Sequence, residues 1–73
     1  MNVLITGTSS GIGNATAIKF LNNGYTVLGI DRLSMPSNLT RYSNYIHYTF
    51  DISKKLPDIE APINILINNA GTQ

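Results

Sequence analysis

The sequence predicts an α/β fold built on a parallel β-sheet of about four strands. Short apolar runs rich in β-branched residues alternate with segments that carry a helical pattern or turn residues. Such an alternation favours parallel strands, because a parallel neighbour is reached only through a crossover connection, and such connections are right-handed. With 73 residues, the chain has room for one domain at most.

The first elements are a buried strand, a glycine-rich turn and a helix. Residues 2–6 (Asn-Val-Leu-Ile-Thr) form an apolar run that stops at Gly7, and the turn extends over residues 7–13. A helix is expected over about residues 11–23, and Gly24 after it is typical of a helix C-terminus. Apolar residues recur at every third position of this helix and are expected to share its buried face: Ile12, Ala15, Ile18 and Leu21.

The middle of the chain predicts two more strands. Residues 25–30 form the second strand, which ends at Asp31. The stretch over residues 32–44 is rich in Ser, Thr and Asn, so it is expected to be a loop with room for one short helix. Residues 45–50 alternate aromatic and β-branched side chains and predict the third strand, which ends at Asp51.

A fourth strand is expected near the C-terminal end. Residues 52–62 contain two prolines and leave space for barely two helical turns, too little to cover the second face of the sheet. Residues 63–67 form the strand, which Asn68-Asn69-Ala70-Gly71 closes. As an apolar edge without charge or proline, this strand is expected to drive self-association.

Composition excludes several classes of function. The formal net charge is +1 and only 12% of residues are charged, so electrostatics favour neither nucleic acid nor an anionic membrane as partner. No apolar run approaches the ~18 residues of a membrane span. The absence of cysteine excludes disulfide scaffolds and Cys-ligated metal sites, and no metal is expected. The first residues lack the pattern of a secretory signal, so a cytoplasmic location is expected.

A strand that runs through a glycine-rich turn into a helix is typical of a phosphate-binding site. The glycines permit the turn, the close approach of a pyrophosphate and close helix–strand packing, while backbone N–H groups and the helix dipole attract the anion. Their spacing, Gly-x-x-x-Gly-x-Gly at residues 7, 11 and 13, fits neither Gly-x-Gly-x-x-Gly nor the Walker loop. Three hydroxyl side chains are expected to donate further hydrogen bonds to phosphate: Thr8, Ser9 and Ser10.

Asp31 strengthens this interpretation, because it lies 18 residues beyond Gly13 at the end of the second strand. A carboxylate at this spacing accepts hydrogen bonds from both adenosine ribose hydroxyls and repels a 2′-phosphate. The alternative is a solvated Asp31 that pairs with Arg32. Arg32 also leaves NADP open beside NAD, since a basic side chain there can hold a 2′-phosphate.

The chain resembles the short-chain dehydrogenases/reductases. Residues 6–13 (Thr-Gly-Thr-Ser-Ser-Gly-Ile-Gly) are similar to the Thr-Gly-x-x-x-Gly-Ile-Gly cofactor loop of that family. Residues 68–71 are similar to its Asn-Asn-Ala-Gly motif, and Asp51 with Ile52 to the Asp and apolar residue that contact adenine. These elements occur in the family's order and cover essentially the whole chain.

The resemblance implies a partial Rossmann (doubly wound) fold with strand order 3-2-1-4, and an oxidoreductase that transfers hydride between NAD(P) and a carbonyl or alcohol carbon. Ser10 stands where relatives that prefer the 2′-phosphate often carry Lys or Arg, so NAD is expected over NADP. Asn68 is similar to a residue that braces the sheet. The cofactor-binding positions it implies are Gly7, Thr8, Ser9, Ser10, Gly11, Ile12, Gly13, Asp31, Arg32, Asp51, Ile52, Asn69, Ala70 and Gly71.

Several of these residues also have structural explanations. Asp51 fits a turn or helix cap, and Asn68 and Asn69 fit structural hydrogen-bonding roles. His47 stands without a nearby acidic pair or second histidine, so a surface position in the third strand is expected rather than catalysis. Tyr45 is expected to serve in packing.

No catalytic residue is expected in this chain. The family's catalytic Ser and Tyr-x-x-x-Lys pair lie beyond the Asn-Asn-Ala-Gly motif. No tyrosine here has a lysine four positions on: Tyr25, Tyr42, Tyr45 and Tyr48 are followed at that spacing by Gly29, Ile46, Thr49 and Ile52. Residues 1–73 are therefore expected to be the cofactor-binding N-terminal part of a longer oxidoreductase.

Two alternatives stay open at this point. One is a stand-alone, non-enzymatic nucleotide-binding or dimerising module, and the other is a degraded gene product. A chain of this size gains about as much from apolar burial as it loses in conformational entropy, on the order of 100 kcal/mol each. It is thus expected to need a ligand, a second copy or further sequence.

Overall fold

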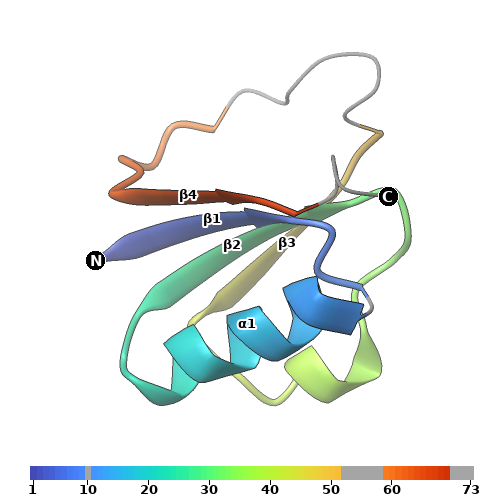
Figure 1. The fold of residues 1–73 in the computed structure, drawn as a ribbon, viewed down its shortest axis with the longest axis horizontal. Coiled ribbons are helices and arrows are strands. Elements are labelled where there is room, and N and C mark those ends of the chain that lie inside the picture. Colours follow the sequence, from blue (N-terminus) through green and yellow to red (C-terminus); the bar gives the residue numbers. More distant parts are fainter. Residues whose placement is uncertain (10, 52–58, 70–73) are drawn as a thin grey trace.

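Four parallel strands form one sheet with the order β3-β2-β1-β4, as Figure 1 shows. The computed structural model describes residues 1–9, 11–51 and 59–69. Fold class and strand order are both confirmed. The strands are β1 (Asn2–Thr6), β2 (Thr26–Asp31), β3 (Tyr45–Thr49) and β4 (Ile65–Asn68).

Helix α1 (Gly11–Asn22) and the short 3-10 helix η1 (Ser37–Leu39) lie on the same side of the sheet (Figure 1). The predicted stop after α1 is confirmed: Gly24 has φ +84° and donates its N–H to the Leu21 carbonyl at 3.2 Å. Helix η1 occupies the predicted loop and inserts the fully buried Leu39 into the core. No helix among the described residues is long and apolar enough to span a membrane.

The predicted buried face of α1 is wrong in part. The helix buries Gly13, Ala17 and Leu21, whereas Ile12 is 76% exposed and Ala15 is also exposed. An α-helix has 3.6 residues per turn, so the nine-residue step from position 12 to position 21 makes two and a half turns. Ile12 and Leu21 therefore point to opposite sides, and a spacing of four describes the buried stripe better than a spacing of three.

A main core fills the space between the sheet and the two helices. Side chains from alternate positions of β1 and β2 meet α1, η1 and the start of β3 there. The fully or almost fully buried residues of this cluster are Val3, Ile5, Ala17, Leu21, Val27, Leu39 and Tyr45.

The second face of the sheet is covered better than the sequence indicates. Leu4, Leu28 and Ile30 form a second buried cluster. The segment that leads into β4 packs on it with Ile59, Ala61 and Ile63. Coverage stops short of both sheet edges, where Leu66 is 62% and Ile46 is 45% exposed.

The fourth strand begins two residues later than expected, because Asn2 holds the residues before it. The Asn2 N–H donates to Oδ1 of Asn64 at 2.8 Å, and the Asn64 N–H donates to the Asn2 carbonyl at 3.0 Å. The Asn2 amide group donates to the Pro62 carbonyl at 2.8 Å. This clamp sets the register in which Val3 lies opposite Ile65.

Candidate functional site

The residues implied as cofactor-binding gather at one edge of the sheet. The carboxyl ends of parallel strands lie at the same edge of the sheet. Within two residues of the carboxyl end of a different strand lies each of four residues: Gly7, Asp31, Asp51 and Asn69. Open α/β sheets bind ligands at this edge. Four residues assigned by the resemblance lie outside the described residues: Ser10, Ile52, Ala70 and Gly71.

The glycine-rich turn has the backbone conformation that its glycines predict. Gly7 has φ 77° and Gly11 has φ 61°, in the left-handed region that side chains disfavour. The Gly7 N–H donates to the Ile30 carbonyl at 2.7 Å, so pairing with β2 continues one residue past the end of β1. The chain then turns sharply away from the sheet to start α1.

Gly13 allows α1 to lie directly against this turn. A Cβ atom at this position would overlap the Gly7 carbonyl oxygen and lie 2.8 Å from Nδ2 of Asn69. The first N–H groups of an α-helix have no intrahelical acceptor, and the first turn of α1 carries no acidic side chain. The helix dipole adds positive potential at this end. The turn and the start of α1 thus offer donors to an anion.

Asp31 joins the end of β2 to the glycine-rich turn. Its Oδ2 atom accepts the Ser9 N–H at 3.0 Å, and its Oδ1 atom accepts the Leu33 N–H at 2.9 Å. The expected alternative, a pair with Arg32, does not form: Arg32 is exposed, and the Asp31 carboxylate bonds backbone groups instead. A carboxylate has about four acceptor positions, so two remain for further donors.

Thr8 points into the protein rather than toward a ligand. Its side chain is 0% exposed, and Oγ1 lies 2.8 Å from the phenol oxygen of Tyr45. The expected hydrogen bond from this hydroxyl to phosphate is therefore not available in this conformation. The Ser9 hydroxyl likewise has a protein partner, the Ser34 carbonyl at 3.3 Å.

Tyr45 and His47 extend the hydrogen bonding of Thr8 toward the surface. The Tyr45 phenol oxygen lies 2.7 Å from Nδ1 of His47, and His47 Nε2 lies 3.0 Å from the Leu33 carbonyl oxygen. Burial raises the pKa of Tyr45 above its ordinary value of 10.0, the charge of Asp31 adds to this rise, and the bond to Thr8 offsets part of it. His47 is half-buried and bonded at both ring nitrogens, unlike the surface residue that the sequence predicts.

A second contact that sequence reasoning missed joins α1 to η1. Asn14 donates its amide to the Thr8 carbonyl at 3.0 Å and to Oδ1 of Asn38 at 3.1 Å. Asn38 donates back to Oδ1 of Asn14 at 2.7 Å. These bonds fasten the glycine-rich turn to η1, and nothing in the spacing of the two asparagines, 24 residues apart, indicates the pair.

The two asparagines at the end of β4, Asn68 within it and Asn69 directly after it, brace the sheet and the turn. Oδ1 of Asn68 accepts the Thr6 hydroxyl at 3.0 Å, as the resemblance implies for a bracing residue. Nδ2 of Asn69 donates to the Gly7 carbonyl at 3.4 Å, so Asn69 contacts the glycine-rich turn directly. Asp51 is exposed after the end of β3.

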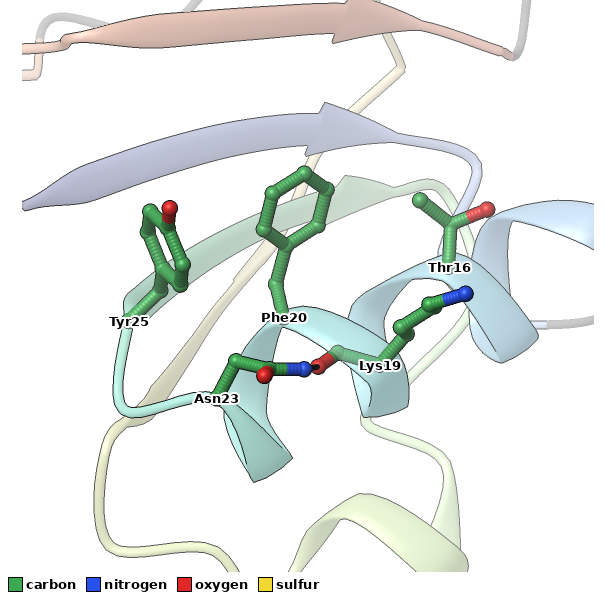
Figure 2. A pocket seen from close by; sticks show the side chains of 5 residues that line it. All are labelled: Thr16, Lys19, Phe20, Asn23 and Tyr25. Carbon is green, nitrogen blue, oxygen red and sulfur yellow. Dashed lines mark hydrogen bonds between the residues drawn. The ribbon is translucent and has the colours of Figure 1, made fainter.

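A pocket also lies away from this edge, along α1 (Figure 2). Its aromatic floor is formed by Phe20 and Tyr25, whose rings meet edge to face at 5.1 Å. Asn23 donates its amide to the Lys19 carbonyl at 2.7 Å beside it. The pocket shares no lining residue with the glycine-rich turn, so it is not part of the candidate site.

Known proteins match the chain over most of its length. A family model described as short chain dehydrogenase matches residues 1–73. The short chain dehydrogenase ausX of Emericella nidulans is 42% identical over 64 residues, which cover 88% of this chain and 30% of that protein. The NADPH-dependent pterin aldehyde reductase of Arabidopsis thaliana is 31% identical over 84 aligned positions, covering 96% of this chain and 35% of that protein.

Solved structures agree with this match. The crystal structure of a short-chain dehydrogenase/reductase from Burkholderia vietnamiensis superposes with a TM-score of 0.66 and 26% sequence identity. The superposition covers 71% of this chain and 25% of that chain. The chain thus spans about a third or less of the length of these relatives.

Proposed function

Because the chain belongs to the short-chain dehydrogenase family, we propose that it is the cofactor-binding N-terminal part of an NAD(P)-dependent oxidoreductase. The whole protein would transfer a hydride between nicotinamide and a carbonyl or alcohol carbon. The observation that carries the proposal is the hydrogen bond from the Ser9 N–H to the Asp31 carboxylate, which supports a ribose-binding role for Asp31 beside a phosphate-binding role for the turn.

The described residues fit a dinucleotide. The turn at Gly7 and Gly11 and the start of α1 offer donors to the pyrophosphate, and Gly13 leaves room for the helix to approach. When bound, the nicotinamide ring accepts or donates the hydride, and these residues hold and orient the dinucleotide. The proposed set is the one that the resemblance implies: Gly7, Thr8, Ser9, Ser10, Gly11, Ile12, Gly13, Asp31, Arg32, Asp51, Ile52, Asn69, Ala70 and Gly71, with Thr8 acting through its backbone.

NAD is proposed over NADP, because the Asp31 carboxylate would repel a 2′-phosphate at the adenosine ribose. The test is the dissociation constant of the native protein for NADH and for NADPH. Asp31→Asn is the variant, and Glu60→Gln, which removes an exposed carboxylate outside the candidate site, is the charge-matched control. The native protein should bind NADH at least about tenfold more tightly than NADPH. Of the two variants, only Asp31→Asn should reduce this difference between the two dissociation constants. Tighter binding of NADPH to the native protein would contradict this choice.

The catalytic serine, tyrosine and lysine are proposed to lie in further sequence. Support comes from the four tyrosines, none of which has a lysine four positions on, and from the short span relative to the known relatives. The intact mass of the protein from its own source tests this. A mass several times 8.0 kDa is expected, whereas 8.0 kDa would favour the alternative of a stand-alone nucleotide-binding or dimerising module.

The β4 edge is proposed to associate with a second copy when the 73-residue chain is isolated, or to be covered by further sequence. Among the described strands, β4 pairs only with β1, and Leu66 on it is 62% exposed. Sedimentation velocity of the isolated chain should show association that grows with concentration and weakens in Leu66→Lys. A stable monomer at high concentration would refute self-association through the β4 edge.

A cytoplasmic location completes the proposal. Its support is the absence of the cysteine pairs that small secreted domains rely on, and fractionation of source cells tests it.

A further inference from the structure

We propose that Tyr45 and His47 are positioning residues for the nucleotide site, which hold the glycine-rich turn and the Asp31 carboxylate in register through a closed circuit of hydrogen bonds. This inference rests on the proposed function, since it concerns the same turn and the same carboxylate. Neither residue would touch the cofactor.

The circuit is oriented by one backbone carbonyl. A carbonyl oxygen only accepts hydrogen bonds, so Nε2 of His47, 3.0 Å from the Leu33 oxygen, must carry the hydrogen. The other nitrogen of the neutral ring, Nδ1, then has a free lone pair and accepts. The bond to Leu33 thereby selects one tautomer of His47.

The remaining bonds take their direction from that tautomer. The Tyr45 hydroxyl donates to Nδ1 at 2.7 Å, and the Tyr45 oxygen therefore accepts the Thr8 hydroxyl at 2.8 Å. Thr8 is 0% and Tyr45 is 6% exposed, so water cannot substitute for either partner. The Thr8 hydroxyl therefore donates to Tyr45, and the Tyr45 hydroxyl donates to His47.

Both ends of this row return to Asp31. At one end, Thr8 is followed by Ser9, whose N–H donates to Oδ2 of Asp31 at 3.0 Å. At the other end, Leu33 donates its N–H to Oδ1 at 2.9 Å. The hydrogen bonds through Tyr45 and His47 thus connect the backbone at residues 8–9 with the backbone at Leu33, the two segments that the Asp31 carboxylate also bridges. Their loss would free Asp31 to rotate away from the ribose.

Gly29 indicates that strand β2 is adapted to this arrangement. Gly29 lies opposite His47 in the β2–β3 pairing. A Cβ atom at residue 29 would overlap the Tyr45 phenol oxygen and lie 2.5 Å from Oγ1 of Thr8. A side chain at this position is therefore incompatible with the Thr8–Tyr45 bond.

The test uses the native protein and compares its dissociation constants for NADH and NADPH with those of Tyr45→Phe. This variant keeps the ring and removes the hydroxyl. It should weaken NADH binding by about fivefold or more and narrow the NADH preference over NADPH. Tyr25→Phe is the matched control. Tyr25 is a half-buried tyrosine directly before β2, at the end of the strand opposite Asp31, and its change should leave both dissociation constants unchanged.

Two variants of His47 test its two hydrogen bonds separately. His47→Asn offers an acceptor near the position of Nδ1 and should retain the bond from Tyr45, whereas His47→Gln offers a donor near Nε2 and should retain the bond to Leu33. Each should bind NADH more weakly than the native protein but more tightly than His47→Ala. These variants stand at a half-buried position, so they also serve if Tyr45→Phe does not fold.

Nitrogen-15 NMR of the His47 ring in the ligand-free protein provides a readout that does not depend on the nucleotide. The tautomer with hydrogen on Nε2 is expected, and hydrogen on Nδ1 alone would overturn the inference. If Tyr45→Phe and the His47 variants have the same dissociation constant for NADH as the native protein, and likewise for NADPH, this inference is overturned while the proposed function stays intact. A native protein that binds neither nucleotide would overturn both.

Discussion

The phenol oxygen of Tyr45 occupies the space in which any residue other than glycine at position 29 would place its Cβ atom. The two residues lie on neighbouring strands, and Thr8 Oγ1 borders the same space. A buried polar contact is thus built into the sheet itself. It links strand packing to the conformation of the glycine-rich turn.

Gly29→Ala should destabilise the protein by about 1–3 kcal/mol, because Tyr45 and Thr8 must both move to admit one methyl group. Urea unfolding measures the loss. Gly24→Asn is the control: nothing lies within 4 Å of a Cβ there, and Asn tolerates the left-handed φ of +84°. Equal stability of Gly29→Ala and the native protein would show that the sheet relaxes freely at this point.

Gly13→Ala should weaken dinucleotide binding by about tenfold or more, because the added methyl group pushes α1 away from the Gly7 carbonyl and the Asn69 amide. Calorimetric titration with NADH tests this. Ala15→Ser, an exposed change in the same helix, should bind NADH like the native protein. Unchanged binding by Gly13→Ala would mean that close helix–turn packing is not needed for the site.

Leu39→Ala should cost about 2–5 kcal/mol of unfolding free energy, since this fully buried side chain leaves a cavity under η1. Leu33→Ala, at a position that is 57% exposed, should stay within about 0.5 kcal/mol of the native protein. Thermal unfolding of both variants measures the difference. Similar losses in the two would argue that η1 is not anchored by Leu39.

The stability of the protein should fall in alkaline solution, partly through Tyr45. Burial raises the pKa of its phenol above 10.0, so the folded state keeps this proton at a pH where the unfolded chain has lost it. The contribution is complete below pH 10.0 and is lost as the pH rises through the folded-state pKa. Unfolding free energies between pH 8 and 11 should therefore fall less steeply in Tyr45→Phe, and parallel curves would contradict this assignment.

Features set by local sequence were predictable here. The first strand matches residue for residue, and the glycine turn, Gly24 and the strand order follow from short motifs and from the family resemblance. The buried face of α1 was not, because a run at spacing three drifts around a helix until Ile12 faces away from Leu21.

The contacts between Thr8, Tyr45 and His47 were beyond sequence reasoning for a different reason. They depend on the register in which Gly29 lies opposite His47, and register is a property of two strands together. An alternation of Tyr45 and His47 on one face of a strand, opposite a lone glycine in its neighbour, is the signal that could have found them.

The Asn2 clamp has a consequence for the order of events during synthesis. Strand β1 leaves the ribosome before β2 and β4, yet it lies between them in the sheet, and its bond to Asn64 spans 62 residues. Its pairing on the β4 side cannot form until residues 64–68 have emerged. Pairings of such high contact order form slowly. Until β4 pairs, the apolar residues Val3–Ile5 have one side of their strand unpaired and can be bound by chaperones.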